Sequence, residues 1–185
     1  GNVEHISCRG MLGAEVPDAG RKLVNRGISG DTTRGLLRRW REEALDIEPD
    51  VLSLLIGTND CFLEDENHVE PEEYEKNLES ILSQSFETNG ELKVFLMEPF
   101  FLPTKDRFKA EENTCREEIG RYSQICRRVA EKDGRIFFIP LQHLFDEAAE
   151  GRDCAYWIWD GIHPTESGHA LIAREWIKAF KAMFE

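Results

Sequence analysis

The feature that most constrains the fold is an alternation of short apolar runs with longer stretches in which apolar residues recur at helical spacing. Nearly unbroken apolar runs at 51–56, 92–97 and 136–139 are typical of strands buried on both faces. The stretches between and after them predict amphipathic helices. Strands that alternate with helices form parallel sheets covered by helices on both faces. The pattern therefore predicts an α/β fold.

The helix-forming stretches also carry signals for where each helix begins and ends. Thr32 or Thr33 is expected to cap the first helix, and Pro71 suits the first turn of the second. Gly134 ends the third, and Pro164 is expected to begin the last. A further short strand is expected at 23–25, and a short helix around 144. The predicted apolar stripes are Leu36, Leu37, Trp40 and Ala44; Tyr74, Leu78, Ile81 and Leu82; Cys115, Ile119, Tyr122, Cys126 and Val129; and Ile172, Trp176, Phe180 and Met183.

Length, charge and cysteine content narrow the class of protein. The 185 residues fit one domain, residues 1–185, and the formal net charge of -13 argues against nucleic-acid or anionic membrane partners. No apolar run reaches the roughly 20 residues that span a bilayer. Five cysteines without a CxxC pair indicate free thiols, and no signal-peptide pattern opens the chain. We expect a cytoplasmic protein, with a removed signal peptide and association with further copies of the chain left open.

The first motif is the segment 25–33, NRGISGDTT, between a predicted strand and a predicted helix. Gly30 permits a tight turn and leaves its backbone N–H open to a ligand, near the positive end of the helix dipole. The alternative is a strand-to-helix turn without chemistry. The segment lacks the glycine spacing of a dinucleotide-binding loop or a P-loop.

The second motif, Gly57-Thr58-Asn59-Asp60, follows the most apolar strand. The Asn59 amide can donate to an anionic oxygen, and Asp60 can fix the loop by accepting backbone N–H bonds. The alternative is a polar turn, which these residue types form readily. The two interpretations weigh about equally for this motif alone.

The third motif is Asp160-Gly161-Ile162-His163-Pro164. A carboxylate and an imidazole three residues apart in a turn can face one cleft, where the carboxylate orients the ring and stabilises its protonated form. The alternative is a capping Asp beside a surface His. We favour the functional interpretation because the aromatic residues of 156–159 precede the pair and are expected to bury its strand.

Together the three motifs resemble those of the SGNH hydrolases, also called the GDSL esterase family. The stretches NRGISGDTT, LLIGTND and WDGIHPTESGHALIA are similar to that family's second, third and fifth blocks, and the resemblance extends from Leu23 to the final helix. It implies a three-layer α/β/α sandwich with a flavodoxin-like parallel sheet. By resemblance, Gly30 and Asn59 form the oxyanion hole, His163 is the general base and acid, and Asp160 orients it. The implied reaction is hydrolysis of a carboxylic ester through an acyl-serine, without a cofactor or metal.

The family's first block, Gly-Asp-Ser, which carries the nucleophile after the first strand, has no match in this sequence. Ser7 is a weak candidate, because it lies 23 residues before Gly30 where family members place the serine further upstream. Ser29 is interpreted as a turn residue. Three explanations stay open, in this order: a truncated N-terminus, Ser7 in a divergent setting, or loss of catalysis. A short or missing first strand would expose sheet edges that N-terminal residues or another chain would cover.

The preferred substrate is a small acyl ester such as an acetylated carbohydrate, since no long apolar lid is visible. Aromatic residues near the strand ends are candidates for a pocket wall, although core packing explains at least half of them. His169 is expected to pack or cap on the last helix. The rival hypothesis is a catalytically inactive relative that binds an acylated glycan or a protein partner.

Overall fold

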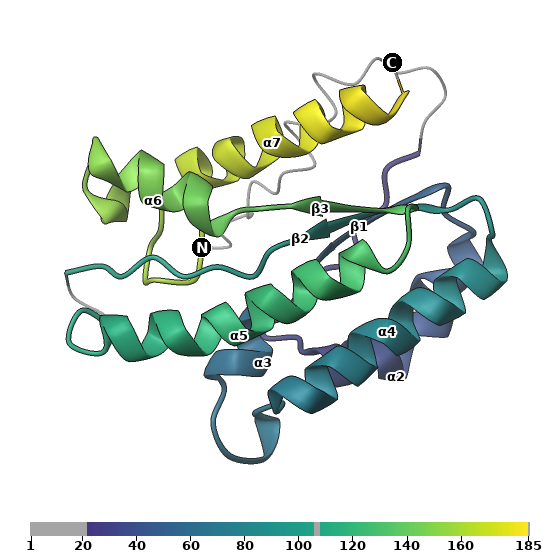
Figure 1. Cartoon of the computed structure of the whole chain (residues 1–185), viewed down its shortest axis with the longest axis horizontal. Helices are drawn as coiled ribbons and strands as arrows, with labels where there is room; N and C mark the ends of the chain where they lie inside the picture. Colours follow the sequence, from purple (N-terminus) through teal and green to yellow (C-terminus); the bar gives the residue numbers. More distant parts are fainter. Residues whose placement is uncertain (1–21, 106–107, 185) are drawn as a thin grey trace, which may run out of the picture.

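The centre of the molecule is a parallel sheet of three strands (Figure 1). The computed structural model describes residues 22–105 and 108–184, and the fold is given for these residues. The strands are β1 (Val51–Leu55), β2 (Lys93–Met97) and β3 (Ile136–Ile139), in the order β1-β2-β3. Val51 lies opposite Lys93, and Val94 lies opposite Ile136. The predicted alternation of strands and helices is confirmed.

Helices cover both faces of this sheet (Figure 1). One face packs against α2 (Thr33–Glu43), α4 (Pro71–Thr88) and α5 (Glu112–Glu131), and the other against α6 (Gln142–Glu150) and α7 (Glu166–Phe184). A short helix, α3 (Thr58–Phe62), follows β1 directly. The remaining elements are single 3-10 turns, at Leu45–Ile47, Asp65–Asn67 and Cys154–Tyr156. The described residues thus form the expected three-layer α/β/α arrangement.

Two apolar clusters hold the layers together, and β2 belongs to both. Val94 and Leu96 point into the cluster under α4 and α5, whereas Phe95 and Met97 point into the cluster under α6 and α7. All four are buried. Side chains of a strand alternate between its two faces, so a central strand with apolar residues at every position is buried on both sides.

Two strand predictions need correction. Residues 23–25 form no strand, and the large apolar side chains there are about 40% exposed. In β1, Leu54 is buried, but Ser53 is exposed and Leu55 is 39% exposed, so β1 is not buried on both faces as its sequence suggested. Both corrections have the same physical reason. Among the described residues β1 pairs only with β2, and no described strand lies along its other edge.

The helices begin where the sequence predicts, with one exception. Thr32 caps α2, accepting the Gly35 N–H at 3.3 Å, and Pro71 occupies the first turn of α4. The last helix begins at Glu166 and not at Pro164. The Thr165 hydroxyl accepts the Gly168 N–H at 3.2 Å there, while Pro164 forms an antiparallel bridge with Ile158. None of the helices in the described ranges is long and apolar enough to cross a membrane.

Candidate active site

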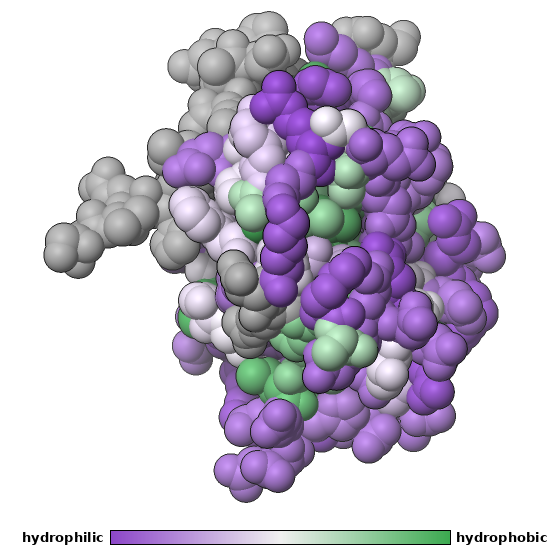
Figure 2. All heavy atoms as spheres, turned by 90° about the vertical axis from the view of Figure 1, so that its left-hand side faces the viewer, coloured by the Kyte–Doolittle hydropathy of each residue, from purple (hydrophilic) through white to green (hydrophobic). Residues whose placement is uncertain are grey.

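A pocket of about 200 Å³ opens where the chain leaves β1 and where it enters α7. Ligand sites of open parallel sheets lie at the carboxyl ends of the strands, which is where this pocket is found. Figure 2 views the molecule from that end, and apolar side chains reach the surface there between hydrophilic ones. The pocket brings two of the predicted residues together. Its lining comprises Leu55, Thr58, Asn59, Phe100, Ile162, His163, Pro164, His169 and Ile172.

Asp160 and His163 form the predicted carboxylate–imidazole pair. The ring nitrogen Nδ1 of His163 lies 3.0 Å from both Asp160 carboxylate oxygens. Asp160 Oδ1 also accepts the backbone N–H groups of His163 at 3.1 Å and Ile162 at 3.3 Å, which closes the turn. A carboxylate at Nδ1 favours the tautomer that carries its proton there, and this leaves Nε2 as the basic nitrogen. The turn therefore presents an oriented base.

The charge of Asp160 is stabilised by this turn. Partial burial opposes the charge, but the hydrogen bonds from the His163 ring and from the two backbone amides outweigh it and lower the pKa of Asp160. The carboxylate thus stays ionised at neutral pH and can balance an imidazolium that forms during a reaction.

The aromatic residues before the pair do not lie in a buried strand, which contradicts the sequence prediction. Trp159 is 65% exposed and Tyr156 is 45% exposed, because this segment forms a 3-10 turn and a single bridge in place of a strand. The Trp159 N–H donates to the His163 carbonyl at 2.8 Å and holds the backbone of the pair. The His163 side chain is 58% exposed, so a substrate can reach it from solvent.

Asn59 lies in the first turn of α3 and lines the pocket together with residues of α7. Its Nδ2 donates one hydrogen to the Asp31 carbonyl at 2.9 Å, and an amide NH₂ carries a second hydrogen. The following residue, Asp60, is fully buried and accepts the Thr33 N–H at 3.0 Å and the Thr33 hydroxyl at 2.5 Å. Asp60 was expected to fix its own loop by accepting backbone N–H bonds, and the N–H that it accepts comes instead from the start of α2. Burial raises the pKa of Asp60, although the bonds from Thr33 oppose this effect.

Gly30 lies in a tight turn directly before α2. The Asp31 N–H donates to the Ile28 carbonyl at 3.3 Å, and Gly30 has a φ of +79°, as the third position of such a turn requires in a type II geometry. Gly30 is not among the residues that line the pocket, and it connects to the pocket through Asp31 and Asn59. Ser7, the weak nucleophile candidate, lies outside the described residues.

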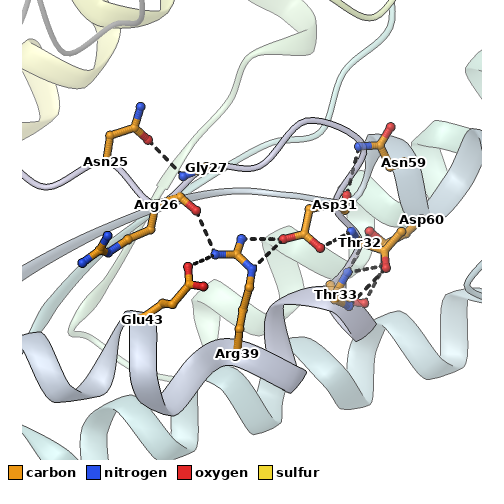
Figure 3. A network of polar contacts seen from close by, with 11 residues as sticks. Asn25, Arg26, Gly27, Asp31, Thr32, Thr33, Arg39, Glu43, Asn59 and Asp60 are labelled. Carbon is orange, nitrogen blue, oxygen red and sulfur yellow. Dashed lines mark hydrogen bonds and ion pairs between the residues drawn. The ribbon is translucent and has the colours of Figure 1, made fainter.

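Sequence reasoning missed several residues of this region. Asp31 and Arg39 form an ion pair beside the Gly30 turn (Figure 3), and no spacing in the sequence distinguishes them from other charges on an exposed helix. His169, expected only to pack or cap, lines the pocket. The available signal for His169 was its place in the first turn of the helix that follows the pair.

Comparisons with known proteins identify the family of this chain. A family model described as the GDSL-like lipase/acylhydrolase family matches residues 6–171. An acetylxylan esterase from Geobacillus stearothermophilus is 32% identical over 176 residues, which cover 91% of this chain and 76% of that protein. The solved structure of an acetylxylan esterase from the same organism has a TM-score of 0.79 at 31% identity, covering 93% of this chain and 78% of that chain. The solved structure of an alpha/beta hydrolase enzyme from the metagenome of Lake Arreo, Spain, has a TM-score of 0.80 at 32% identity, covering 93% of this chain and 78% of that chain. The chain therefore belongs to the GDSL-like lipase/acylhydrolase family of ester-hydrolysing enzymes.

Proposed function

We propose that this chain hydrolyses short-chain carboxylic esters, with acetylated carbohydrates as its substrate class. The observation that carries the proposal is the Asp160 carboxylate at 3.0 Å from His163 Nδ1, in a turn whose histidine shares one pocket with Asn59. This arrangement supplies an oriented base and an amide donor at the same site. Acyl transfer needs both groups.

In the proposed reaction, His163 Nε2 takes the proton of a serine hydroxyl while the serine oxygen attacks the acyl carbon. The carbonyl oxygen becomes an oxyanion, which the Gly30 N–H and the Asn59 amide stabilise. The imidazolium then gives its proton to the departing alcohol, and water cleaves the acyl-serine by the same steps with His163 again as the base. Asp160 keeps the ring oriented. The serine is assigned to a part of the chain outside the described residues, where Ser7 stays a candidate.

The size and lining of the pocket support a small acyl group. Leu55, Phe100, Ile162 and Ile172 give it an apolar wall, and a volume of about 200 Å³ leaves little room for a long chain. The name of the related acetylxylan esterase supports an acetyl ester of a carbohydrate. Variants of the solved relative in which a serine or an aspartate is replaced by alanine are described as catalytic mutants, which supports a serine and an aspartate in the machinery.

Hydrolysis of p-nitrophenyl acetate, butyrate and octanoate tests this proposal. We expect turnover of the acetate to be fastest, and His163→Ala to reduce it by a factor of about 10³ or more because the base is lost. The matched control is His143→Ala, since His143 is also an exposed histidine paired with a carboxylate, Glu147, at 3.1 Å. Equal activity in wild type and His163→Ala would refute the assigned base.

A second candidate function is binding of an acylated glycan without turnover. The observation that favours it is that the sequence contains no Gly-Asp-Ser block, which carries the nucleophile in the family. A fluorophosphonate probe followed by peptide mass spectrometry separates the two functions. Labelling of a specific serine supports the esterase. Saturable binding of acetylated xylo-oligosaccharide without labelling supports the binding protein.

A further inference from the structure

Arg39 lies in the middle of α2 and reaches back to both ends of the Gly30 turn (Figure 3). Its Nη1 donates to the Arg26 carbonyl at 2.9 Å, before the turn. Its Nε and Nη2 donate to Asp31 Oδ2 at 3.0 and 2.5 Å, after the turn. A guanidinium group presents these donors in a fixed plane, so the contacts set the distance between the two ends of the turn.

The clamped turn is in direct contact with the pocket wall. The carbonyl of Asp31 accepts the Asn59 side-chain N–H at 2.9 Å, and Asp31 follows Gly30 in the chain. Any movement of Asp31 therefore moves two groups together, the Gly30 amide and the Asn59 amide. These are the two donors assigned to the oxyanion hole.

Burial and packing make the clamp stronger than an ordinary surface ion pair. The Arg39 side chain is 16% exposed and the Asp31 side chain 12%, whereas exposed pairs contribute little. A third partner, Glu43, accepts from Arg39 Nη1 through Oε2 at 2.6 Å and adds a further contact to the guanidinium. Gly35 makes room for the clamp, because a Cβ at that position would lie 1.8 Å from Asp31 Oδ1.

We propose that Arg39 is a positioning residue, which fixes the turn of Gly30 against Asn59 through the carboxylate of Asp31 and the carbonyl of Arg26. Arg39 does not itself line the pocket. Its effect on catalysis rests on the proposed function, but its effect on the turn does not. The two effects are tested separately.

The turn is tested by amide hydrogen exchange of residues 26–31 in the full chain. Arg39→Gln removes the charge and the planar fork, and we expect exchange in this segment to become about tenfold faster or more. The matched control is Arg34→Gln. Arg34 lies on the same helix and makes the same type of contact, donating to Glu73 at 2.5 and 2.6 Å and to the Glu66 carbonyl at 2.8 Å, away from the turn. The Arg34→Gln variant should therefore leave amide exchange in residues 26–31 unchanged.

Gly35→Ala supplies a second, independent variant. Alanine normally stabilises a helix relative to glycine, but here its Cβ displaces the Asp31 carboxylate while Arg39 is intact. We expect faster exchange in 26–31 together with unchanged or slower exchange in the rest of α2. A variant that merely loosens the helix would show the opposite distribution.

The catalytic effect is tested by hydrolysis of p-nitrophenyl acetate. Arg39→Gln should lower kcat about tenfold to 100-fold with KM within about twofold, since misplaced donors weaken binding of the oxyanion and not of the ester. Arg34→Gln should keep both constants at the wild-type value. If wild type does not hydrolyse the ester, the proposed function fails and the exchange data alone decide on Arg39. Unchanged exchange in Arg39→Gln, or an equal change in Arg34→Gln, overturns the positioning role.

Discussion

Gly30 occupies the turn before α2 with a backbone conformation that favours glycine. Among the described residues, an added Cβ would meet no atom within 4 Å, but φ is +79°, a region that other residues adopt only at a cost. The side chain of alanine would therefore fit while its backbone is strained. The N–H that we assign to the oxyanion hole would remain.

We predict that Gly30→Ala lowers the free energy of unfolding by about 1–2 kcal/mol and leaves substantial esterase activity. Gly90→Ala is the matched control, because a Cβ there also meets open space and Gly90 does not have a positive φ. Urea unfolding of the three proteins measures the difference. Equal stability of Gly30→Ala and wild type would show that the turn relaxes without cost.

Single residues also show what sequence reasoning can reach at this site. Asp160 and His163 were predictable because three residues of one turn fix their separation, whatever the rest of the fold does. The Asp31–Arg39 pair was not, since it depends on how one helix turn follows the preceding loop and on two side-chain conformations. Pairs whose geometry is local can be predicted, and pairs that join a loop to a helix face require the structure.

At the scale of elements, the periodic signals were reliable where both faces of an element are covered. The apolar stripe of α4 and the apolar run of β2 are buried as expected. The segment at 154–159 was misread, because its aromatic residues suggested a buried strand and the chain instead forms a turn with exposed rings. Aromatic content alone does not distinguish a strand from a loop beside a site.

A buried hydroxyl joins α5 to the loop before α4. Tyr122 is 2% exposed and donates to the Val69 carbonyl at 2.6 Å. Burial raises the pKa of Tyr122, so the hydroxyl stays protonated and keeps donating across the accessible pH range. Val69 is fully buried, and its carbonyl has no access to water if the hydroxyl is removed.

We predict that Tyr122→Phe lowers the free energy of unfolding by about 1–3 kcal/mol, because it leaves a buried carbonyl without this donor. Tyr156→Phe serves as the control, since Tyr156 is 45% exposed and water can replace any partner of its hydroxyl. It should change stability by less than about 0.5 kcal/mol. Thermal unfolding measured on both variants checks the prediction, and similar losses in the two would contradict it.

For the whole molecule, the α/β layers could be predicted, but the environment of β1 could not. Its apolar sequence predicts a strand buried on both faces, whereas among the described residues β1 has a neighbouring strand on one edge alone. Leu55 is 39% exposed as a result and borders the pocket. Burial of a strand depends on which other strands join the sheet, and this information is not contained in the strand itself.

Net charge and local ion pairs act in opposite directions on the stability of this acidic molecule. At pH 7 the formal net charge is -13, so the excess negative side chains repel one another. This repulsion weakens as the pH falls toward the isoelectric point of about 4.9. Below that pH, stability depends on the carboxylates whose charged form is stabilised in the fold. The clearest is Asp133, where hydrogen bonds from Arg135 lower the pKa to about 2.

A carboxyl whose pKa is lower in the folded chain stabilises the fold above its unfolded pKa of about 4, and this contribution disappears as the pH falls toward the folded value. We therefore predict that the free energy of unfolding changes little between pH 7 and 5 and declines steeply between pH 4 and 2. Asp133→Asn removes one titrating group, so its decline over that interval should be shallower than that of wild type. The pair is partly exposed and its contribution is small, which makes the difference in slope a better measure than stability at one pH. Urea unfolding at half-unit pH steps measures both slopes, and parallel curves would show that the Asp133–Arg135 contact does not distinguish the folded from the unfolded chain.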